Sequence, residues 1–275
     1  MAVRHLLATF ILSSTLVVCA GCGGWGGGTK WLQQPIDDEK KPSGIPAGEM
    51  EGTPSAGPGG RAGSRTLSGG RRKEDGDRTG GGGRLLGVFR NTYYDFPREG
   101  DHGGPTVALM SASCQPIAQV PRAFHDALCV QGSGSLKRGG TVSFAKRDCA
   151  CADLCPRTGQ RICYDALDPT AFPFGRGAAG TAITPLRTLA ADTAVLPMGT
   201  VVYLPELDGA PRGDGGDTID GCFIVEDRGL KVKGEHVDIF TGNATHTALL
   251  EERLPSNQGV SVVVQAPRCA HLARR

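Results

Sequence analysis

Aromatic residues and net charge are both scarce in this sequence. Aromatic side chains make up 5% of its 275 residues, and its formal net charge at pH 7 is only +2. A charge so small, with no basic stripe interleaved with aromatic residues, argues against nucleic acid as a partner. Because so few aromatic side chains leave a modest hydrophobic core, a fold of this composition would gain from covalent cross-links.

The sequence also lacks an apolar run long enough to span a membrane. The run Leu6–Val18 is about thirteen residues long, whereas a spanning helix needs ~20. Arg4 precedes this run and the small residues Ala20 and Gly21 follow it, which is the pattern of an export signal with its processing site. We therefore expect residues 1–21 to be a signal peptide and the mature protein to be exported.

Cys22 follows this processing site directly. The run from Ala20 to Cys22 is similar to a bacterial lipobox, although Cys19 stands where such motifs usually carry leucine. The motif predicts that Cys22 becomes lipidated. The protein would then be periplasmic and anchored to the outer membrane as a lipoprotein, with the lipid as its one attachment to a membrane. Ordinary signal cleavage nearby, without a lipid, is the alternative.

Eight cysteines remain when Cys19 is assigned to the signal and Cys22 to the lipid. They are Cys114, Cys129, Cys149, Cys151, Cys155, Cys163, Cys222 and Cys269. In an oxidising compartment an even number predicts up to four disulfides, whose connectivity the sequence does not give. A zinc site within the segment 149–163 is the alternative, but Cys149 and Cys151 are spaced more tightly than the usual zinc-binding pairs. We expect disulfides and no metal.

Glycine and proline are concentrated before residue 84. The chain has 42 glycines and 18 prolines, and runs such as Gly57-Pro58-Gly59-Gly60 punctuate a segment of mixed charge without apolar periodicity. Such a segment has too little apolar surface to bury, so residues 22–83 are predicted to be a disordered linker. The folded part is predicted to span residues 84–275.

Short β-branched segments dominate this folded part. We expect a first strand between Leu86 and Tyr94. Further strands are expected at Thr106–Met110, Thr141–Ala145, Ile162–Tyr164, Val201–Leu204, Cys222–Val225 and Val260–Gln265. Helical spacing of apolar residues predicts short helices at Pro121–Cys129 and Ala244–Leu254. Many short strands with few helices predict a mainly β fold built as a compact barrel.

A cysteine-rich insertion interrupts the expected barrel between about residues 97 and 172. Six of the eight mature cysteines lie there, so structural stapling is the expected role, and a contribution to one wall of a groove is the alternative. The small residues Ser133-Gly134-Ser135 and Arg138-Gly139-Gly140 predict two turns within it.

Three aspartates stand where short apolar runs meet glycine turns. They are Asp192, Asp227 and Asp238. Rigid strands fix such side chains while the turns leave them open to a ligand, and a half-desolvated carboxyl group is a candidate general acid. The sequence has no Gly-x-Ser-x-Gly nucleophile motif, so these carboxyl groups are the main catalytic candidates.

These aspartates belong to five motifs in register over about fifty residues. The motifs are Ala191-Asp192, Pro197–Tyr203, Asp227-Arg228-Gly229, Lys233-Gly234 and His236–Phe240. Together they resemble the three-aspartate (3D) domain, which the membrane-bound lytic transglycosylase A family also carries. Upstream, the segment Phe89–Pro97 is similar to the family's Thr-x-Tyr-Tyr-x-Pro opening strand, although Thr92 here directly precedes the tyrosine pair.

The resemblance implies a fold, an activity and a partner. The fold would be a six-stranded double-psi β-barrel, and the protein a monomer that acts on peptidoglycan glycan strands without a cofactor. The activity would be cleavage of the bond between N-acetylmuramic acid and N-acetylglucosamine with a 1,6-anhydro product. The alternative is a non-catalytic, expansin-like barrel that binds wall polysaccharide, with the aspartates only holding its groove.

The resemblance also implies roles for single residues. Asp238 would be the catalytic acid, with Asp227 and Asp192 assisting. Because Arg228 adjoins Asp227, we expect a lowered pKa and an ionised, supporting Asp227. For Asp192, bracing of the turn at Pro197 and direct contact with sugar both remain open.

Five further residues would bind substrate by the same resemblance: Thr92, Tyr93, Tyr94, Lys233 and His236. Without it, the first three could equally be half-buried strand residues. Lys233 could instead bridge a surface acid such as Glu235.

Overall fold

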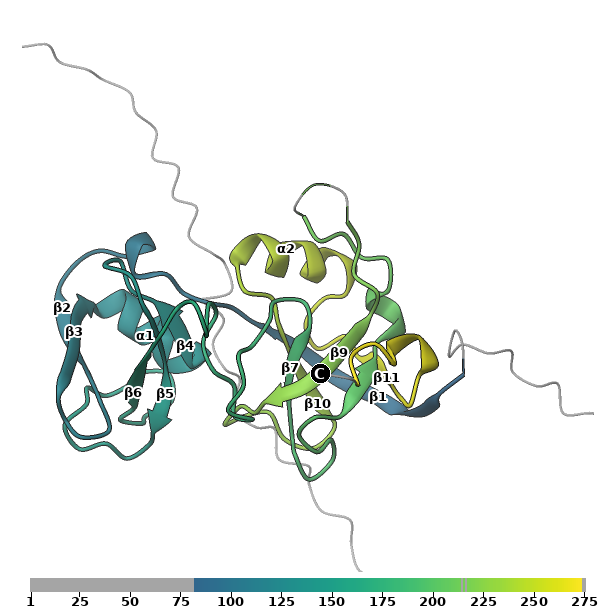
Figure 1. The fold of residues 1–275 in the computed structure, drawn as a ribbon, viewed down its shortest axis with the longest axis horizontal. Coiled ribbons are helices and arrows are strands. Elements are labelled where there is room, and N and C mark those ends of the chain that lie inside the picture. The colour runs from purple at the N-terminus through teal and green to yellow at the C-terminus, as the bar shows by residue number, and fades with distance from the viewer. Residues whose placement is uncertain (1–81, 214, 216, 274–275) are drawn as a thin grey trace, which may run out of the picture. The chain divides into compact units, whose positions relative to one another are not determined.

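The computed structural model describes residues 82–213, 215 and 217–273 (Figure 1). The expected signal peptide, the lipidation site at Cys22 and the expected linker up to residue 81 lie outside the described residues. Within the described part of the chain, no helix combines the length and apolar character needed to cross a membrane.

Six strands close a barrel in the order β1-β10-β7-β9-β8-β11. They are β1 (Arg84–Tyr94), β7 (Thr188–Ala191), β8 (Val201–Tyr203), β9 (Cys222–Asp227), β10 (His236–Phe240) and β11 (Val260–Val264). The pairs β1–β10 and β7–β9 are parallel, and the other four pairs are antiparallel. The mainly β class predicted from the sequence is therefore confirmed.

Alternation of side chains explains how these strands enclose a core. In β9, Phe223 and Val225 join the barrel core, while Cys222 and Ile224 pack on the outer side. In β10, Val237 and Ile239 join the same core. Because successive side chains of a strand face opposite ways, Asp238 between them lies on the outer face of the barrel.

The helix α2 (Ala244–Arg253) lies close to its predicted position. The side chain of Asn243 caps its first turn by accepting a hydrogen bond from the backbone N–H of His246 at 2.8 Å. Leu250 and Leu254 anchor it to the barrel core, and Pro255 follows because it cannot continue a helix. Two single-turn 3₁₀ helices, η3 (Pro205–Leu207) and η4 (Pro267–Cys269), also adjoin the barrel strands.

The insertion between β1 and β7 folds around a core of its own. It contains η2 (Glu99–Asp101), β2 (Thr106–Met110), β3 (Pro116–Pro121), α1 (Arg122–Gln131), β4 (Ser133–Ser135), β5 (Thr141–Lys146) and β6 (Cys163–Leu167). Strands β2 and β3 form one hairpin, and β4-β5-β6 form an antiparallel sheet. Phe124 and Leu128 of α1 are fully buried in this core.

Two local predictions in the insertion need correction. Ser133-Gly134-Ser135, expected as a turn, is strand β4, because Ser133 pairs with Ser143 in register with β5. The strand expected at Ile162–Tyr164 instead runs from Cys163 to Leu167. The turn expected at residues 138–140 is present and connects β4 to β5.

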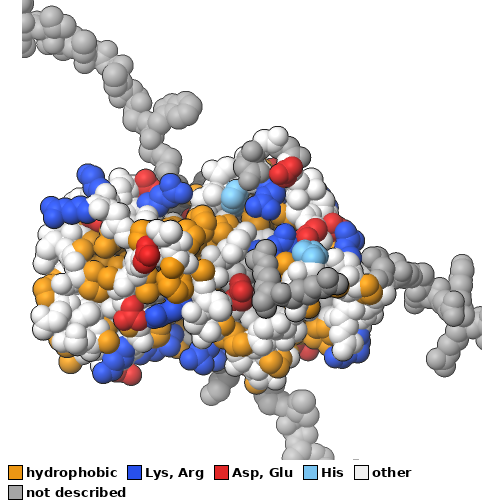
Figure 2. All heavy atoms as spheres, viewed as in Figure 1, with side chains coloured by type: hydrophobic (Ala, Val, Ile, Leu, Met, Phe, Trp, Pro, Cys, Tyr) orange, Lys and Arg blue, Asp and Glu red, His pale blue; other side chains and the backbone are white. Residues whose placement is uncertain are grey.

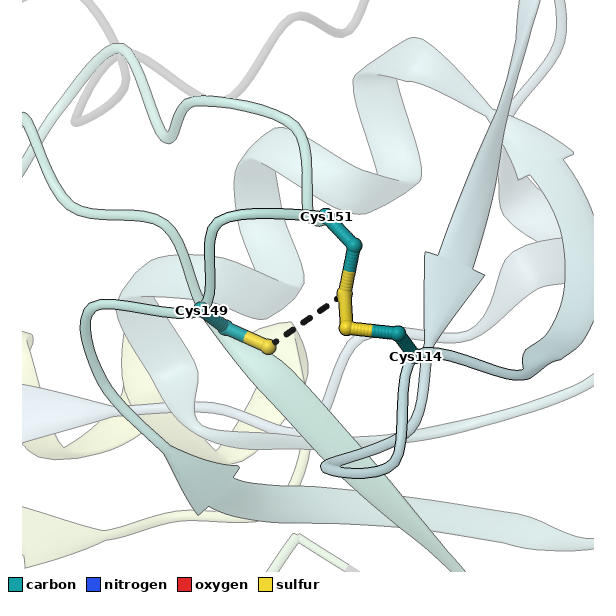
Figure 3. A group of neighbouring side chains, drawn as sticks. All are labelled: Cys114, Cys149 and Cys151. Atoms are coloured by element: carbon teal, nitrogen blue, oxygen red, sulfur yellow. Dashed lines mark hydrogen bonds between the residues drawn. A yellow bond between two sulfur atoms is a disulfide. The ribbon is translucent and has the colours of Figure 1, made fainter.

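All eight cysteines expected in the mature protein form disulfides. The bonds are Cys114–Cys151, Cys129–Cys155, Cys149–Cys163 and Cys222–Cys269. The sulfur atoms of Cys149 and Cys151 lie 3.7 Å apart (Figure 3). The zinc alternative of the sequence used Cys149, Cys151, Cys155 and Cys163. All four are joined in disulfides and so offer no thiolate to a metal.

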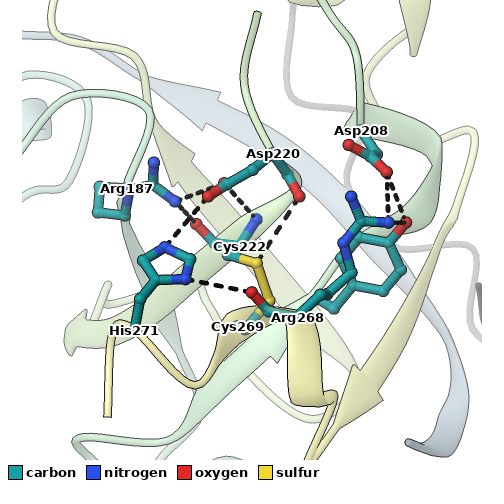
Figure 4. The surroundings of a disulfide bond; sticks show 8 residues. Arg187, Asp208, Asp220, Cys222, Arg268, Cys269 and His271 are labelled. Atoms are coloured by element: carbon teal, nitrogen blue, oxygen red, sulfur yellow. Dashed lines mark hydrogen bonds and ion pairs between the residues drawn. A yellow bond between two sulfur atoms is a disulfide. The ribbon is translucent and has the colours of Figure 1, made fainter. Parts of the chain in front are cut away.

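The fourth disulfide joins β9 to η4 and is surrounded by ion pairs (Figure 4). Asp220 pairs with Arg187 at 2.6 Å and with His271 at 3.1 Å, and Arg268 pairs with Asp208 at 2.7 Å. These charged groups are partly exposed, so they fix the geometry of this end of the chain more than they add to stability.

Candidate active site

A cleft of about 310 Å³ opens where the barrel carries Asp227 and Asp238. The barrel also contributes Tyr94 and Ala190 to its lining. The insertion contributes Cys129, Val130, Gln131, Gly132, Ser133, Phe144, Arg147, Thr158, Gln160 and Ile162. Arg176–Ala178, Gly180 and Arg228–Leu230 complete the lining. The insertion therefore forms part of the cleft as well as being stapled by disulfides.

Asp238 lies on β10, beside Thr92 of β1 in the parallel register. The Thr92 hydroxyl donates a hydrogen bond to Asp238 Oδ1 at 2.7 Å. Burial raises the pKa of Asp238 to about 6, against the lowering effects of Thr92 and the Arg90 charge. The charge of Asp227 also contributes to this raised pKa. Asp238 is therefore a carboxyl group that still holds its proton in mildly acidic solution.

Asp227 ends β9 and accepts three hydrogen bonds. Its Oδ1 accepts from the backbone N–H groups of Arg228 at 2.8 Å and Ala178 at 3.0 Å. Its Oδ2 accepts from the Tyr94 hydroxyl at 3.2 Å. These donors favour the ionised form.

Burial nevertheless raises the pKa of Asp227 above its ordinary value, outweighing those donors and the Arg228 charge. The expectation that Arg228 would lower the pKa of Asp227 is therefore wrong in net direction. Its physical reason is position: the Arg228 side chain is exposed, whereas Asp227 is surrounded by protein. Water screens the exposed Arg228 charge and so weakens its effect on Asp227. The buried Asp227 carboxylate is poorly hydrated, which disfavours its charged form and raises its pKa.

A close backbone approach brings the Ala178 donor to Asp227. A Cβ atom on Gly177 would lie 2.4 Å from the carbonyl oxygen of Glu226, so only glycine fits there. The Ala179 N–H donates to the same carbonyl at 3.0 Å. The glycine-rich segment 175–180 thereby packs on the end of β9 and places the Ala178 N–H on the carboxylate.

His236 reaches Asp238 indirectly, through Thr92. The His236 side chain is buried, and its Nε2 lies 2.8 Å from Thr92 Oγ1. Burial and the Arg90 charge lower its pKa, so the ring is neutral at pH 7. Because the Thr92 hydroxyl donates to Asp238, it has to accept from a protonated Nε2 of His236. The three side chains thus form one hydrogen-bonded row.

Asp192 and Lys233 lie outside the cleft. Asp192 accepts hydrogen bonds from the backbone N–H groups of Gly234 at 2.9 Å and Ala194 at 3.1 Å. These bonds, with a smaller effect of the Lys233 charge, lower the pKa of Asp192. The geometry favours a bracing role over the sugar contact, but the side chain holds the turn at Ala194 and the loop at Gly234 rather than the turn at Pro197.

The two adjacent tyrosines separate as strand alternation requires. Tyr94 lines the cleft and stacks near Phe240, with ring centroids 4.9 Å apart. Tyr93 packs against the barrel core, and its hydroxyl donates to the Leu254 carbonyl at 2.6 Å. Tyr93 is not among the residues that line the cleft, so its geometry favours a structural role over the predicted substrate contact.

The individual residues that the insertion and the glycine-rich segment bring to the cleft could not be identified from the sequence. Arg147, Gln160 and Ala178 belong to no motif that was recognised. The dense glycines of the segment 175–180 were the one available signal, because such runs allow close backbone packing.

The comparison with family models identifies one domain. The family described as "3D domain" matches residues 187–249, the segment that contains Asp192, Asp227 and Asp238. The resemblance recognised in the sequence is thereby confirmed. No curated protein sequence matches the chain.

Three similar solved structures are the following, of which the second and third are described as lytic transglycosylases. MltA of E. coli with bound chitohexaose is 16% identical, with 65% of this chain and 71% of that chain covered and a TM-score of 0.46. The membrane-bound lytic murein transglycosylase of Agrobacterium tumefaciens is 17% identical, with coverages of 58% and 54% and a TM-score of 0.39. LtgG of Burkholderia pseudomallei is 16% identical, with coverages of 65% and 71% and a TM-score of 0.37.

Proposed function

We propose that this protein is a peptidoglycan lytic transglycosylase in which Asp238 is the proton donor. The observation that carries the proposal is that Asp238, hydrogen-bonded to Thr92, shares a cleft with Asp227, where burial raises its pKa to about 6. A general acid works best when its pKa lies near the working pH. The match of residues 187–249 to the 3D domain supports the same activity.

The proposed reaction uses one carboxyl group twice. Asp238 protonates the glycosidic oxygen between N-acetylmuramic acid and N-acetylglucosamine as that bond breaks. The 6-hydroxyl oxygen of the muramic acid then bonds to its own anomeric carbon and gives its proton to the Asp238 carboxylate. The acid is restored, the product ends in a 1,6-anhydro sugar, and no water is consumed. The carboxyl pair of ordinary glycosidases is therefore not required.

Asp227 has a different proposed role. Its three hydrogen-bond donors favour the ionised form, and its charge raises the pKa of Asp238. An ionised Asp227 keeps the proton on Asp238 before the bond breaks, and its negative charge stabilises the positive charge that develops on the sugar ring.

The fold and location complete the proposal. We assign the six-stranded barrel to the double-psi topology, which its two parallel strand pairs support. The mature protein is a monomer, exported to the periplasm and anchored to the outer membrane through a lipid on Cys22. Four disulfides support export, because such bonds persist in oxidising compartments.

The test is the mass of the soluble products that the purified protein releases from peptidoglycan sacculi. Muropeptides ending in 1,6-anhydromuramic acid are expected, and reducing ends instead would mean that water attacks. Asp238→Asn should abolish release while sacculus binding survives. Asp101→Asn, an exposed aspartate of η2 outside the cleft lining, is the matched control. Binding without release by the folded wild-type protein would favour the expansin-like alternative.

A further inference from the structure

One arginine in the cleft wall, Arg147, is held in place without an acidic partner among the residues that the structure describes. The Arg147 guanidinium lies over the Phe144 ring, 4.6 Å from its centroid, and its Nε donates to Gln160 Oε1 at 2.9 Å. Phe144, Arg147 and Gln160 all line the cleft. The stacking and the hydrogen bond fix the plane of the guanidinium, which leaves its terminal N–H groups available to a ligand.

The charges around Arg147 favour an anionic ligand. Among the described residues, Arg147 forms no ion pair, whereas Arg176 in the same lining is paired with Asp165. Arg228 also lines the cleft, is exposed, and forms no ion pair within the described part of the chain. An unpaired, oriented guanidinium is suited to bidentate recognition of a carboxylate.

Apolar side chains lie in the same lining. Val130 and Leu230 keep 48% and 42% of their surface exposed, and both border the cleft. On the face drawn in Figure 2, hydrophobic side chains gather over the insertion, the part coloured teal in Figure 1, with basic side chains around them. An exposed apolar surface beside an oriented cation indicates a ligand with both small apolar groups and carboxylates.

We infer that this wall is a subsite for an anionic peptide substituent of the glycan, with Arg147 binding one of its carboxylates. The inference rests on the proposed function and defines the substrate as a peptide-bearing strand. Small side chains of the peptide contact Val130 and Leu230, and Arg228 adds attraction at the rim. The acids of the reaction lie on β9 and β10, whereas Arg147 belongs to the insertion. The peptide is therefore bound apart from the scissile bond.

Binding measurements in the Asp238→Asn background test this inference without turnover. The two probes are soluble peptidoglycan strands with their peptides and the same strands stripped of peptide by an amidase. We expect tighter binding of the peptide-bearing strands, and a loss of roughly tenfold on Arg147→Gln for these strands alone. Arg147→Lys should fall between, because it keeps the charge and loses the planar fork.

Arg138→Gln is the matched control, since Arg138 is an exposed arginine of the same insertion outside the cleft lining. Equal affinity for both probes, or an equal loss on both with Arg147→Gln, would overturn the subsite. If wild-type protein still releases anhydro products in that case, the proposed function stands and only the subsite fails. If the protein binds neither probe, both the subsite and the proposed function are wrong. Circular dichroism of each variant separates loss of a contact from loss of the fold.

Discussion

Replacing Thr92 by valine tests the environment of the proposed acid most directly. Valine has nearly the shape of threonine but no hydroxyl. The change removes the hydrogen bond to Asp238 Oδ1 at 2.7 Å and the contact with His236 Nε2 at 2.8 Å. The Thr92 hydroxyl stabilises the ionised carboxylate and lowers the pKa of Asp238. Its loss should therefore raise that pKa further above its ordinary value.

The size of the effect follows from the strength of such bonds. A hydrogen bond to a charged group contributes about 1.5–3 kcal/mol, and about 1.36 kcal/mol corresponds to one pKa unit. In the proposed reaction, activity requires protonated Asp238 and falls as the pH rises through its pKa. The alkaline limb of the pH–rate profile should therefore move upward by about one to two pH units in Thr92→Val.

Release of anhydromuropeptides from soluble strands, measured from pH 4 to pH 9, gives this profile. Thr92→Ser keeps the hydroxyl and should leave the limb close to its wild-type position. An alkaline limb that stays in place in Thr92→Val, or moves to lower pH, would refute the role of this hydrogen bond. Thermal unfolding of both variants controls for damage to the barrel, since the change also leaves His236 Nε2 without its partner.

Two further substitutions and one mass measurement have expected outcomes. Burial raises the pKa of Asp238 from 3.8 to about 6, so the folded state binds this proton more tightly and loses stability as the pH rises across that interval. Asp238→Asn should thus raise the free energy of unfolding by up to about 3 kcal/mol at pH 8 and by little at pH 4, as measured by urea unfolding. Equal effects at the two pH values would contradict this expectation. Gly177→Ala should lower the free energy of unfolding by about 1–3 kcal/mol and reduce turnover. Gly103→Ala, with open space around its Cβ position, should change neither quantity. Unchanged turnover in Gly177→Ala would contradict the role given to the Ala178 donor. Intact mass of the mature protein should show four disulfides and no free thiol beyond any lipidated Cys22, and stoichiometric zinc with reduced thiols would be the contrary result.

Local sequence patterns were sufficient to predict most strands of the barrel. The strands at Cys222 and Val260 are dense in β-branched residues, and Pro255 marks the limit of the second helix. Strand β4 was missed because serine and glycine carry no β-propensity. Its register comes from pairing with β5, where the buried hydroxyls of Ser133 and Ser143 lie 2.8 Å apart.

The three aspartates could be found from their motifs, but their separate roles could not be derived from local sequence. Asp192 has a motif as clear as that of Asp238, yet its backbone donors Gly234 and Ala194 give it a lowered pKa. The pKa of Asp227 was predicted to be lowered because Arg228 is adjacent in sequence, but it is raised. Burial depends on how the chain folds around Asp227, and its effect on the pKa outweighs that of the neighbouring charge.

The protonation order of Asp227 and Asp238 follows from their unequal hydrogen bonding. Both carboxyl groups are buried enough to have raised pKa values. Asp227 has three donors from Tyr94, Ala178 and Arg228, whereas Asp238 has the Thr92 hydroxyl. Asp227, which has more hydrogen-bond donors, ionises first, and its charge then makes ionisation of Asp238 more difficult. Each donor on Asp227 therefore keeps the proton on Asp238, so segments as distant as β1 and the glycine-rich loop set the acid's strength together.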